Sequence, residues 1–115
     1  MKIAIIGTGY VGLVSGACLS DLGHTVICVD TDAAKIDRIN QGIMPIYEKD
    51  LEPLVINNIK AGRLQCTTSL KDAMKDAQVI MIAVGTPACP NSGQADLSYV
   101  YEASKQIAAH IKDYV

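Results

Sequence analysis

The alternation of short apolar runs with helix-like segments constrains the fold of this chain more than any other feature. Apolar runs rich in β-branched residues predict strands at residues 2–6, 25–29, 64–68 and 79–84. The other segments carry apolar residues three or four positions apart, which predicts helices at 11–22, 32–41, 51–61, 70–75 and 96–112. Such an alternation requires a parallel sheet with helices on both faces and right-handed crossovers. We therefore expect a three-layer α/β fold built on a doubly wound parallel sheet.

The predicted helices carry expectations about their starts and their inward faces. Short polar side chains before a helix accept its first free N–H groups. Four such N-caps are expected, at Asp32, Asp50, Ser69 and Asp96. In the first helix the same spacing predicts an inward face made of Val11, Val14, Cys18, Leu19 and Leu22. The run at 79–84 is continuously apolar, which is typical of a parallel strand covered on both faces.

Composition and charge exclude several classes of protein. A chain of 115 residues is long enough for one domain with one core. The net charge of −2 offers no basic surface to nucleic acid, and the only aromatic residues are five tyrosines. No apolar run approaches the roughly 18 residues that cross a bilayer, so no membrane partner is expected.

The four cysteines indicate neither a metal site nor a disulfide framework. Their spacing fits no zinc or redox motif, so no metal ligand is predicted. Free cysteines are usually small buried hydrophobes, and we expect this of Cys18, Cys28 and Cys66, whereas Cys89 falls in a loop. The first strand begins at Lys2 and leaves no room for a signal peptide. Together these features predict a reduced, cytoplasmic setting.

A glycine motif links the first predicted strand to the first predicted helix. Gly7, Gly9 and Gly12 fit G-x-G-x-x-G, and an acidic residue, Asp30, ends the next strand. Gly7 permits a tight turn, Gly9 lets a pyrophosphate approach the main chain, and Gly12 allows close packing of the helix. Free N–H groups at the helix start would then face the phosphates. This context predicts a dinucleotide-binding fold of the Rossmann type, although a glycine turn without a ligand is the alternative.

Asp30 favours NAD over NADP as the cofactor. A carboxylate at the end of the second strand accepts hydrogen bonds from the adenosine ribose and repels a 2′-phosphate. Lys35 is the nearest cation and could soften that preference, but a surface lysine on a helix is the plainer interpretation. For Asp30, the alternative is a solvated charge at a strand end.

A third candidate group, Gly85 and Thr86, directly follows the fourth predicted strand. In a doubly wound sheet the ligand lies across the carboxyl ends of the first and fourth strands. A hydroxyl at Thr86 could therefore reach the second ribose or a phosphate. An ordinary Gly-Thr-Pro turn explains these residues equally well.

The chain resembles the UDP-glucose/GDP-mannose dehydrogenase family along its whole length. The resemblance rests on residues 1–13, on the Gly-Thr-Pro loop at 85–87 and on Ala-Asp-Leu-Ser-Tyr at 95–99. It implies NAD contacts at Gly7, Gly9, Tyr10, Val11, Gly12, Asp30, Lys35, Gly85 and Thr86. Members of the family often have Pro-Gly after Tyr-Glu, but Lys49 and Asp50 follow Glu48 here, so the role of the Tyr47-Glu48 loop stays open.

The resemblance also implies an activity and indicates which part of the enzyme this chain forms. Enzymes of the family oxidise the C6 alcohol of UDP-glucose to UDP-glucuronate with two NAD, through a cysteine nucleophile that none of the four cysteines here matches. We therefore expect residues 1–115 to be an incomplete N-terminal NAD-binding domain with no catalytic residue, from a longer homo-oligomeric enzyme that takes a UDP-sugar. The alternative is a stand-alone dinucleotide-sensing module; a methyltransferase or flavin domain is disfavoured. With strands in the order 3-2-1-4, the fourth becomes an edge open to self-association.

Overall fold

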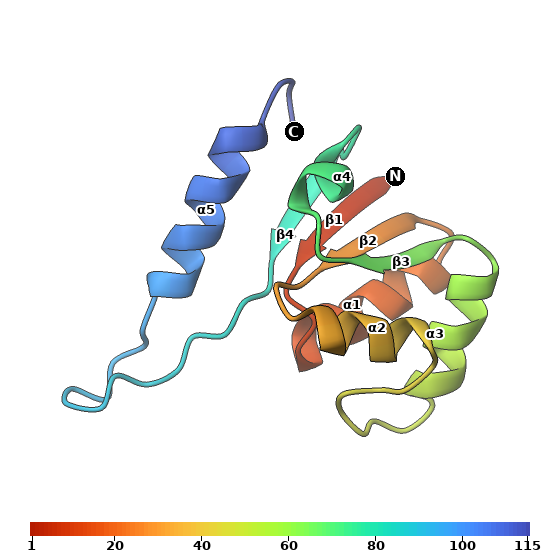
Figure 1. Cartoon of the computed structure of the whole chain (residues 1–115), viewed down its shortest axis with the longest axis horizontal. Helices are drawn as coiled ribbons and strands as arrows, with labels where there is room; N and C mark the ends of the chain where they lie inside the picture. The colour runs from red at the N-terminus through yellow and green to blue at the C-terminus, as the bar shows by residue number, and fades with distance from the viewer.

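Four parallel strands form one sheet in the order β3-β2-β1-β4, which confirms the predicted architecture (Figure 1). The computed structural model describes residues 1–115. The strands are β1 (Lys2–Ile6), β2 (Thr25–Val29), β3 (Leu64–Thr67) and β4 (Val79–Ile82). In β1, Ile6 lies opposite Val29 of β2 on one side and Ile82 of β4 on the other. The carboxyl ends of β1, β2 and β4 therefore meet at one edge of the sheet.

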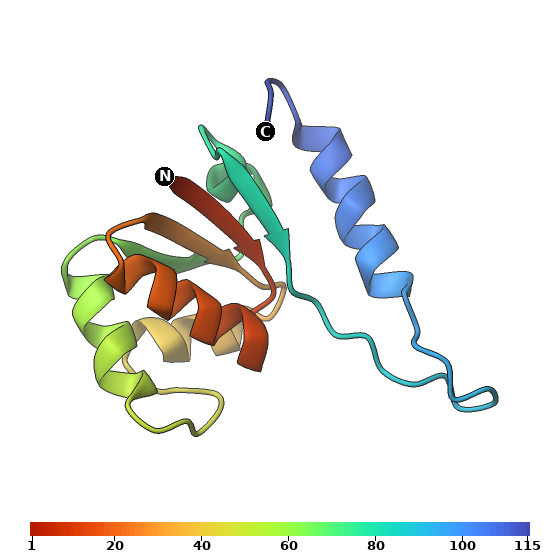
Figure 2. The same cartoon turned by 180° about the vertical axis from the view of Figure 1, so that it is seen from behind.

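Helices cover both faces of the sheet, as the alternation predicts. The helices are α1 (Tyr10–Asp21), α2 (Ala33–Asn40), α3 (Leu51–Lys60), α4 (Leu70–Met74) and α5 (Ser98–His110). The first three share the larger apolar cluster, which includes Ile5, Leu13 and Val55. On the other face α4 packs over Ala4 and Ile27 and α5 packs over Ile6. Figure 2 shows that a long irregular segment joins β4 to α5.

The inward face of α1 differs from the predicted one. Its buried residues are Gly12, Leu13, Gly16, Ala17 and Ser20. Val11 and Leu22 are 64% and 77% exposed, and Cys18 is exposed as well. The helix lies so close to the sheet that a Cβ on Gly16 would come within 2.7 Å of Cys28 Sγ. Small residues permit this approach. Val14 and Leu19 do pack against the larger apolar cluster, so the prediction was right for these two residues and wrong for Val11, Cys18 and Leu22.

Two of the four predicted N-caps are confirmed. The side chains of Asp32 and Ser69 accept hydrogen bonds from Lys35 N and Asp72 N. Asp50 precedes α3 but adopts a left-handed conformation (φ 65°) and makes no capping bond. Asp96 accepts the Ser98 N–H at 2.9 Å, yet the residue at the N-cap of α5 is Leu97.

Strand β4 is an edge of the sheet, as expected, and it has packing partners on both faces: Val79 and Met81 contact the larger apolar cluster and Ile80 contacts the clusters of the other face, but none of these side chains is fully buried. It ends at Ile82 rather than at residue 84, and Ile82 is 41% exposed. No strand pairs with its outer side, and the segment after it leads away to α5. Cys28 and Cys66 are buried as predicted, and all four cysteines are free. No helix has the length and apolarity to cross a membrane.

Candidate cofactor-binding site

The turn between β1 and α1 has the shape that the glycine motif predicts. Gly7 has φ +112°, and its N–H donates to Val29 O at 2.7 Å, so the turn is tied to β2. A Cβ on Gly7 would lie 2.3 Å from Ala83 O, and one on Gly12 would lie 2.1 Å from Gly7 O. Only glycine fits these two positions without moving main-chain atoms. Both residues therefore shape the turn and bring α1 close to the sheet.

Gly9 lies in open space and begins a run of free main-chain donors. It has an ordinary φ of −74°, and no atom lies within 4 Å of where its Cβ would be. Leu13 N is the first amide of α1 with an acceptor inside the chain, namely Gly9 O. The N–H groups of Gly9, Tyr10, Val11 and Gly12 have no acceptor in the protein. They form the positively polarised end of a 12-residue helix and suit a phosphate group.

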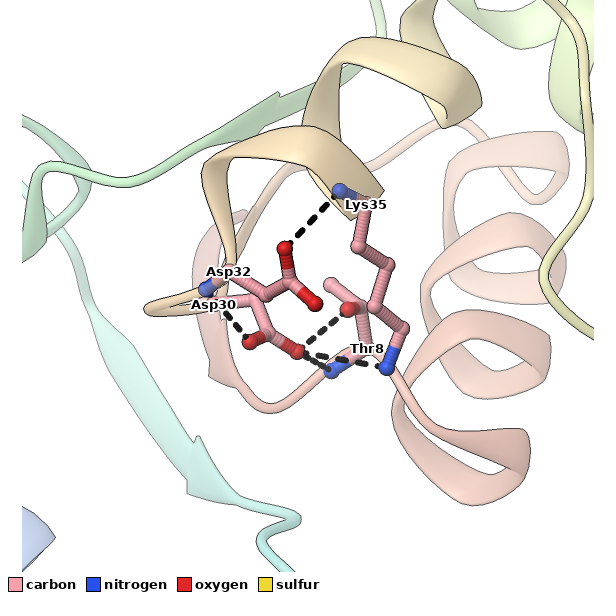
Figure 3. Close-up of polar contacts among 4 residues, drawn as sticks. All are labelled: Thr8, Asp30, Asp32 and Lys35. Carbon is pink, nitrogen blue, oxygen red and sulfur yellow. Dashed lines mark hydrogen bonds and ion pairs between the residues drawn. The ribbon is translucent and has the colours of Figure 1, made fainter.

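Asp30 lies beside this turn and is held by donors from three segments (Figure 3). Its Oδ2 accepts hydrogen bonds from Thr8 Oγ1 at 2.5 Å and from Thr8 N at 3.2 Å. Lys35 Nζ lies 3.5 Å from the same oxygen and forms the one ion pair of the chain. The other carboxylate oxygen, Asp30 Oδ1, accepts a single hydrogen bond, from Asp32 N at 3.1 Å. The carboxylate is thus anchored by four donors and still has an acceptor site on Oδ1.

The surroundings keep Asp30 ionised. Partial burial alone would raise the pKa of Asp30, but donors outweigh it: the Thr8 hydroxyl first, then the Asp32 N–H, the Lys35 ammonium and the Thr8 N–H. The pKa of Asp30 is therefore lower than that of an ordinary aspartate. A charged carboxylate at this place can accept hydrogen bonds from sugar hydroxyls and repels a phosphate.

Thr8 is a part of the site that the sequence did not single out. It occupies the variable position between Gly7 and Gly9, where the motif sets no residue type. Its side chain is fully buried, although it lies in a turn. A hydroxyl residue inside a glycine motif, with an acidic residue ending the next strand, is the signal that could have found it.

Gly85 and Thr86 leave the sheet next to the glycine turn. Ala83 N donates to Ile6 O at 2.8 Å, and Ala83 O is the atom that a Cβ on Gly7 would strike. Both Gly85 and Thr86 are exposed, and no hydrogen bond joins Thr86 to the other site residues. The structure therefore brings this segment to the same edge of the sheet without linking it to Asp30.

The Tyr47-Glu48 loop reaches the start of α1, a contact the sequence left open. The neighbouring Glu48 carboxylate raises the pKa of the Tyr10 hydroxyl. Tyr47 itself is almost fully exposed. The loop also encloses a hollow of about 580 Å³ lined by residues between Gly42 and Pro53.

Comparison with known proteins confirms the resemblance. The model of the UDP-glucose/GDP-mannose dehydrogenase family, NAD binding domain, matches residues 1–115. UDP-glucose 6-dehydrogenase from Rhizobium meliloti is 51% identical over 99% of this chain and 26% of its own length. GDP-mannose 6-dehydrogenase from Azotobacter vinelandii is 44% identical over 98% of this chain and 26% of its own.

Solved structures agree. A ternary complex of GDP-mannose dehydrogenase from Pseudomonas aeruginosa superposes with a TM-score of 0.93 and 46% identity, over 98% of this chain and 26% of that one. A UDP-glucose dehydrogenase from Pyrobaculum islandicum has a TM-score of 0.85 and 35% identity, over 91% and 24%. The chain spans about a quarter of the length of these relatives. It belongs to the UDP-glucose/GDP-mannose dehydrogenase family and corresponds to the NAD-binding domain of that family.

Proposed function

We propose that NAD lies across the carboxyl ends of β1, β2 and β4. The free N–H groups of Gly9, Tyr10, Val11 and Gly12 hold the pyrophosphate, in a turn that Gly7 shapes. The observation that carries this assignment is that four successive N–H groups without an acceptor begin at Gly9, where no other atom lies within 4 Å of an added Cβ. Open space beside unpaired main-chain N–H groups suits a bound phosphate group.

The two ends of the cofactor extend from this turn in opposite directions. Asp30 and Lys35 bind the adenosine ribose, since Asp30 Oδ1 has an unused acceptor site and the lysine has unused donors. Gly85 and Thr86 lie along the nicotinamide half. NAD supplies the hydride acceptor when bound, and the chain itself binds and orients it.

The charges at the ribose end favour NAD over NADP. Asp30 and Asp32 place two carboxylates there against the single ammonium of Lys35 (Figure 3). A 2′-phosphate would have to approach this net negative charge, whereas two ribose hydroxyls would not.

For the whole protein we propose a nucleotide-sugar dehydrogenase that oxidises the C6 alcohol of UDP-glucose to UDP-glucuronate with two NAD. Residues 1–115 form its N-terminal cofactor domain, and the catalytic nucleophile comes from another part. The chain is 51% identical to a UDP-glucose 6-dehydrogenase and 44% identical to a GDP-mannose 6-dehydrogenase. UDP-glucose is therefore the first substrate to test, and GDP-mannose is the second. Four free cysteines favour a cytoplasmic location.

We propose that the protein is a homo-oligomer, and that this chain alone associates through the outer edge of β4. That edge carries unpaired main-chain groups and the half-exposed Ile82. Sedimentation equilibrium should detect association that Ile82→Lys weakens. A chain that stays monomeric at high concentration would contradict this part of the proposal.

Cofactor titration tests the site. The chain should bind NAD more tightly than NADP in calorimetry, and Asp30→Asn should weaken NAD binding while leaving the far-ultraviolet circular dichroism unchanged. Asparagine keeps an acceptor for the buried Thr8 hydroxyl, so it removes the charge without leaving a polar group unpaired. Tighter binding of NADP than of NAD would overturn the assignment of Asp30. The chain alone, mixed with UDP-glucose and NAD, should form no NADH.

A further inference from the structure

Thr8 is the most completely buried polar residue at the site, and it touches Asp30 with two donors. Its exposed fraction is 0%, and its hydroxyl lies 2.5 Å from Asp30 Oδ2. Any residue except proline at position 8 would supply the main-chain N–H, which lies 3.2 Å from the same oxygen. The hydroxyl is therefore the part of Thr8 that this residue type adds.

The hydroxyl makes the two carboxylate oxygens of Asp30 unequal. Oδ2 receives both Thr8 donors and the Lys35 ammonium, which use all of its lone pairs. Oδ1 receives only the Asp32 N–H and keeps one acceptor site. Rotation about the last torsion of an aspartate is soft. A short bond from a fully buried, β-branched side chain restrains that rotation, because Thr8 itself has little freedom to move.

We propose that Thr8 is a positioning residue for cofactor recognition: its hydroxyl fixes the Asp30 carboxylate so that Oδ1 stays available to the ribose diol. This inference rests on the proposed role of Asp30 and adds to it. The Thr8 hydroxyl is also the strongest of the contacts that lower the pKa of Asp30, ahead of the Asp32 N–H and Lys35. The other charged groups facing Asp30 are Lys35 on α2 and the Asp32 carboxylate before it.

The test compares variants that differ at the hydroxyl. Thr8→Val removes the hydroxyl and keeps the shape, and Thr8→Ser keeps the hydroxyl. Thr25→Val, at the exposed opposite end of β2, is the matched control. Each variant is titrated with NAD by calorimetry, and the side-chain carboxyl carbon of Asp30 is titrated by NMR without cofactor. If Thr8→Val fails to fold, Thr8→Ala against Thr8→Ser provides the same comparison.

The expected result is a pattern across both measurements. Thr8→Val should weaken NAD binding on the order of threefold to tenfold, since a hydrogen bond to a charged group is lost. It should also move the midpoint of the Asp30 titration up towards that of an ordinary aspartate. Thr8→Ser should restore both properties, and Thr25→Val should change neither.

Other outcomes would overturn the inference. If Thr8→Val leaves either NAD affinity or the Asp30 midpoint at the original value, the hydroxyl does not position the carboxylate. If Thr8→Ser is as impaired as Thr8→Val, the residue acts through its methyl group, which is a packing role. If Asp30→Asn binds NAD as tightly as the original chain, the proposed function of Asp30 fails, whatever the Thr8 variants show.

Discussion

Gly9 and Gly12 belong to one motif, yet the structure predicts opposite consequences for replacing them with alanine. A Cβ at Gly9 would meet nothing within 4 Å, whereas a Cβ at Gly12 would lie 2.1 Å from Gly7 O. Gly9→Ala should therefore spare the fold and impair the cofactor site. Gly12→Ala should impair the fold itself.

The magnitudes follow from these distances. For Gly9→Ala, the lower preference for alanine at an N-cap costs about 0.5–1 kcal/mol, and the stiffer unfolded chain returns about 0.4–1 kcal/mol. The free energy of unfolding should change by no more than about 0.5 kcal/mol. For Gly12→Ala, a carbon–oxygen contact needs about 3.3 Å, so α1 must retreat by roughly 1 Å. Forced displacement of this kind costs about 1–3 kcal/mol.

Two assays separate the effects. Urea unfolding gives the free energy of unfolding, and calorimetry gives the affinity for NAD. Gly9→Ala should bind NAD at least about tenfold more weakly, equivalent to about 1.4 kcal/mol, because its methyl group would enter the open space where we place the pyrophosphate. A Gly9→Ala chain that binds NAD as tightly as the original would refute the placement of the pyrophosphate. A Gly12→Ala chain of unchanged stability would refute the packing argument.

Three further predictions concern the core, the pH dependence and the thiols. Gly16→Ala should lower the free energy of unfolding by about 1–3 kcal/mol in urea, because the added Cβ clashes with Cys28 Sγ. Cys28→Ala in the same chain should recover part of that loss. If the effects of the two substitutions on the free energy of unfolding simply add, the clash is not the cause. Since the pKa of Asp30 is lowered in the folded state, its contribution to stability is present above its unfolded value, near 3.8, and is lost as the pH falls through the folded value. Urea midpoints between about pH 5 and pH 2 should therefore fall less steeply in Asp30→Asn than in the original chain, and identical slopes would argue against it. A thiol reagent should label exposed Cys18 in the folded chain. Cys28, whose pKa is raised by the neighbouring Cys66 and by burial, should react only after unfolding.

The sequence predicts the architecture well because alternation and turn chemistry are local signals. Apolar runs, the caps at Asp32 and Ser69 and the glycine motif each depend on a few neighbouring residues, and the structure bears them out. The order of the strands follows from the handedness of the crossovers rather than from any one residue.

The errors concern features that do not depend on neighbouring residues alone. Periodicity assigns the inward face of α1 to large apolar residues only, but the close approach to β1 and β2 also buries Gly12, Gly16 and Ser20. Asp50 fails as a cap because its own main chain turns left-handed there. Thr8 was missed because its importance depends on Asp30, which is 22 positions away in the chain. None of these facts can be deduced from neighbouring residues alone.

The hydrogen bond from Gly7 N to Val29 O has a consequence for the energetics of the sheet. Together with the bond from Asp30 N to Thr67 O, it sets the separation of the glycine turn and the carboxylate by main-chain pairing. A dinucleotide that binds both the glycine turn and the Asp30 carboxylate connects the carboxyl ends of β1 and β2. Parting these strands would then also require releasing the ligand, so saturating cofactor should slow hydrogen exchange in the two central strands more than at the outer edge of β4.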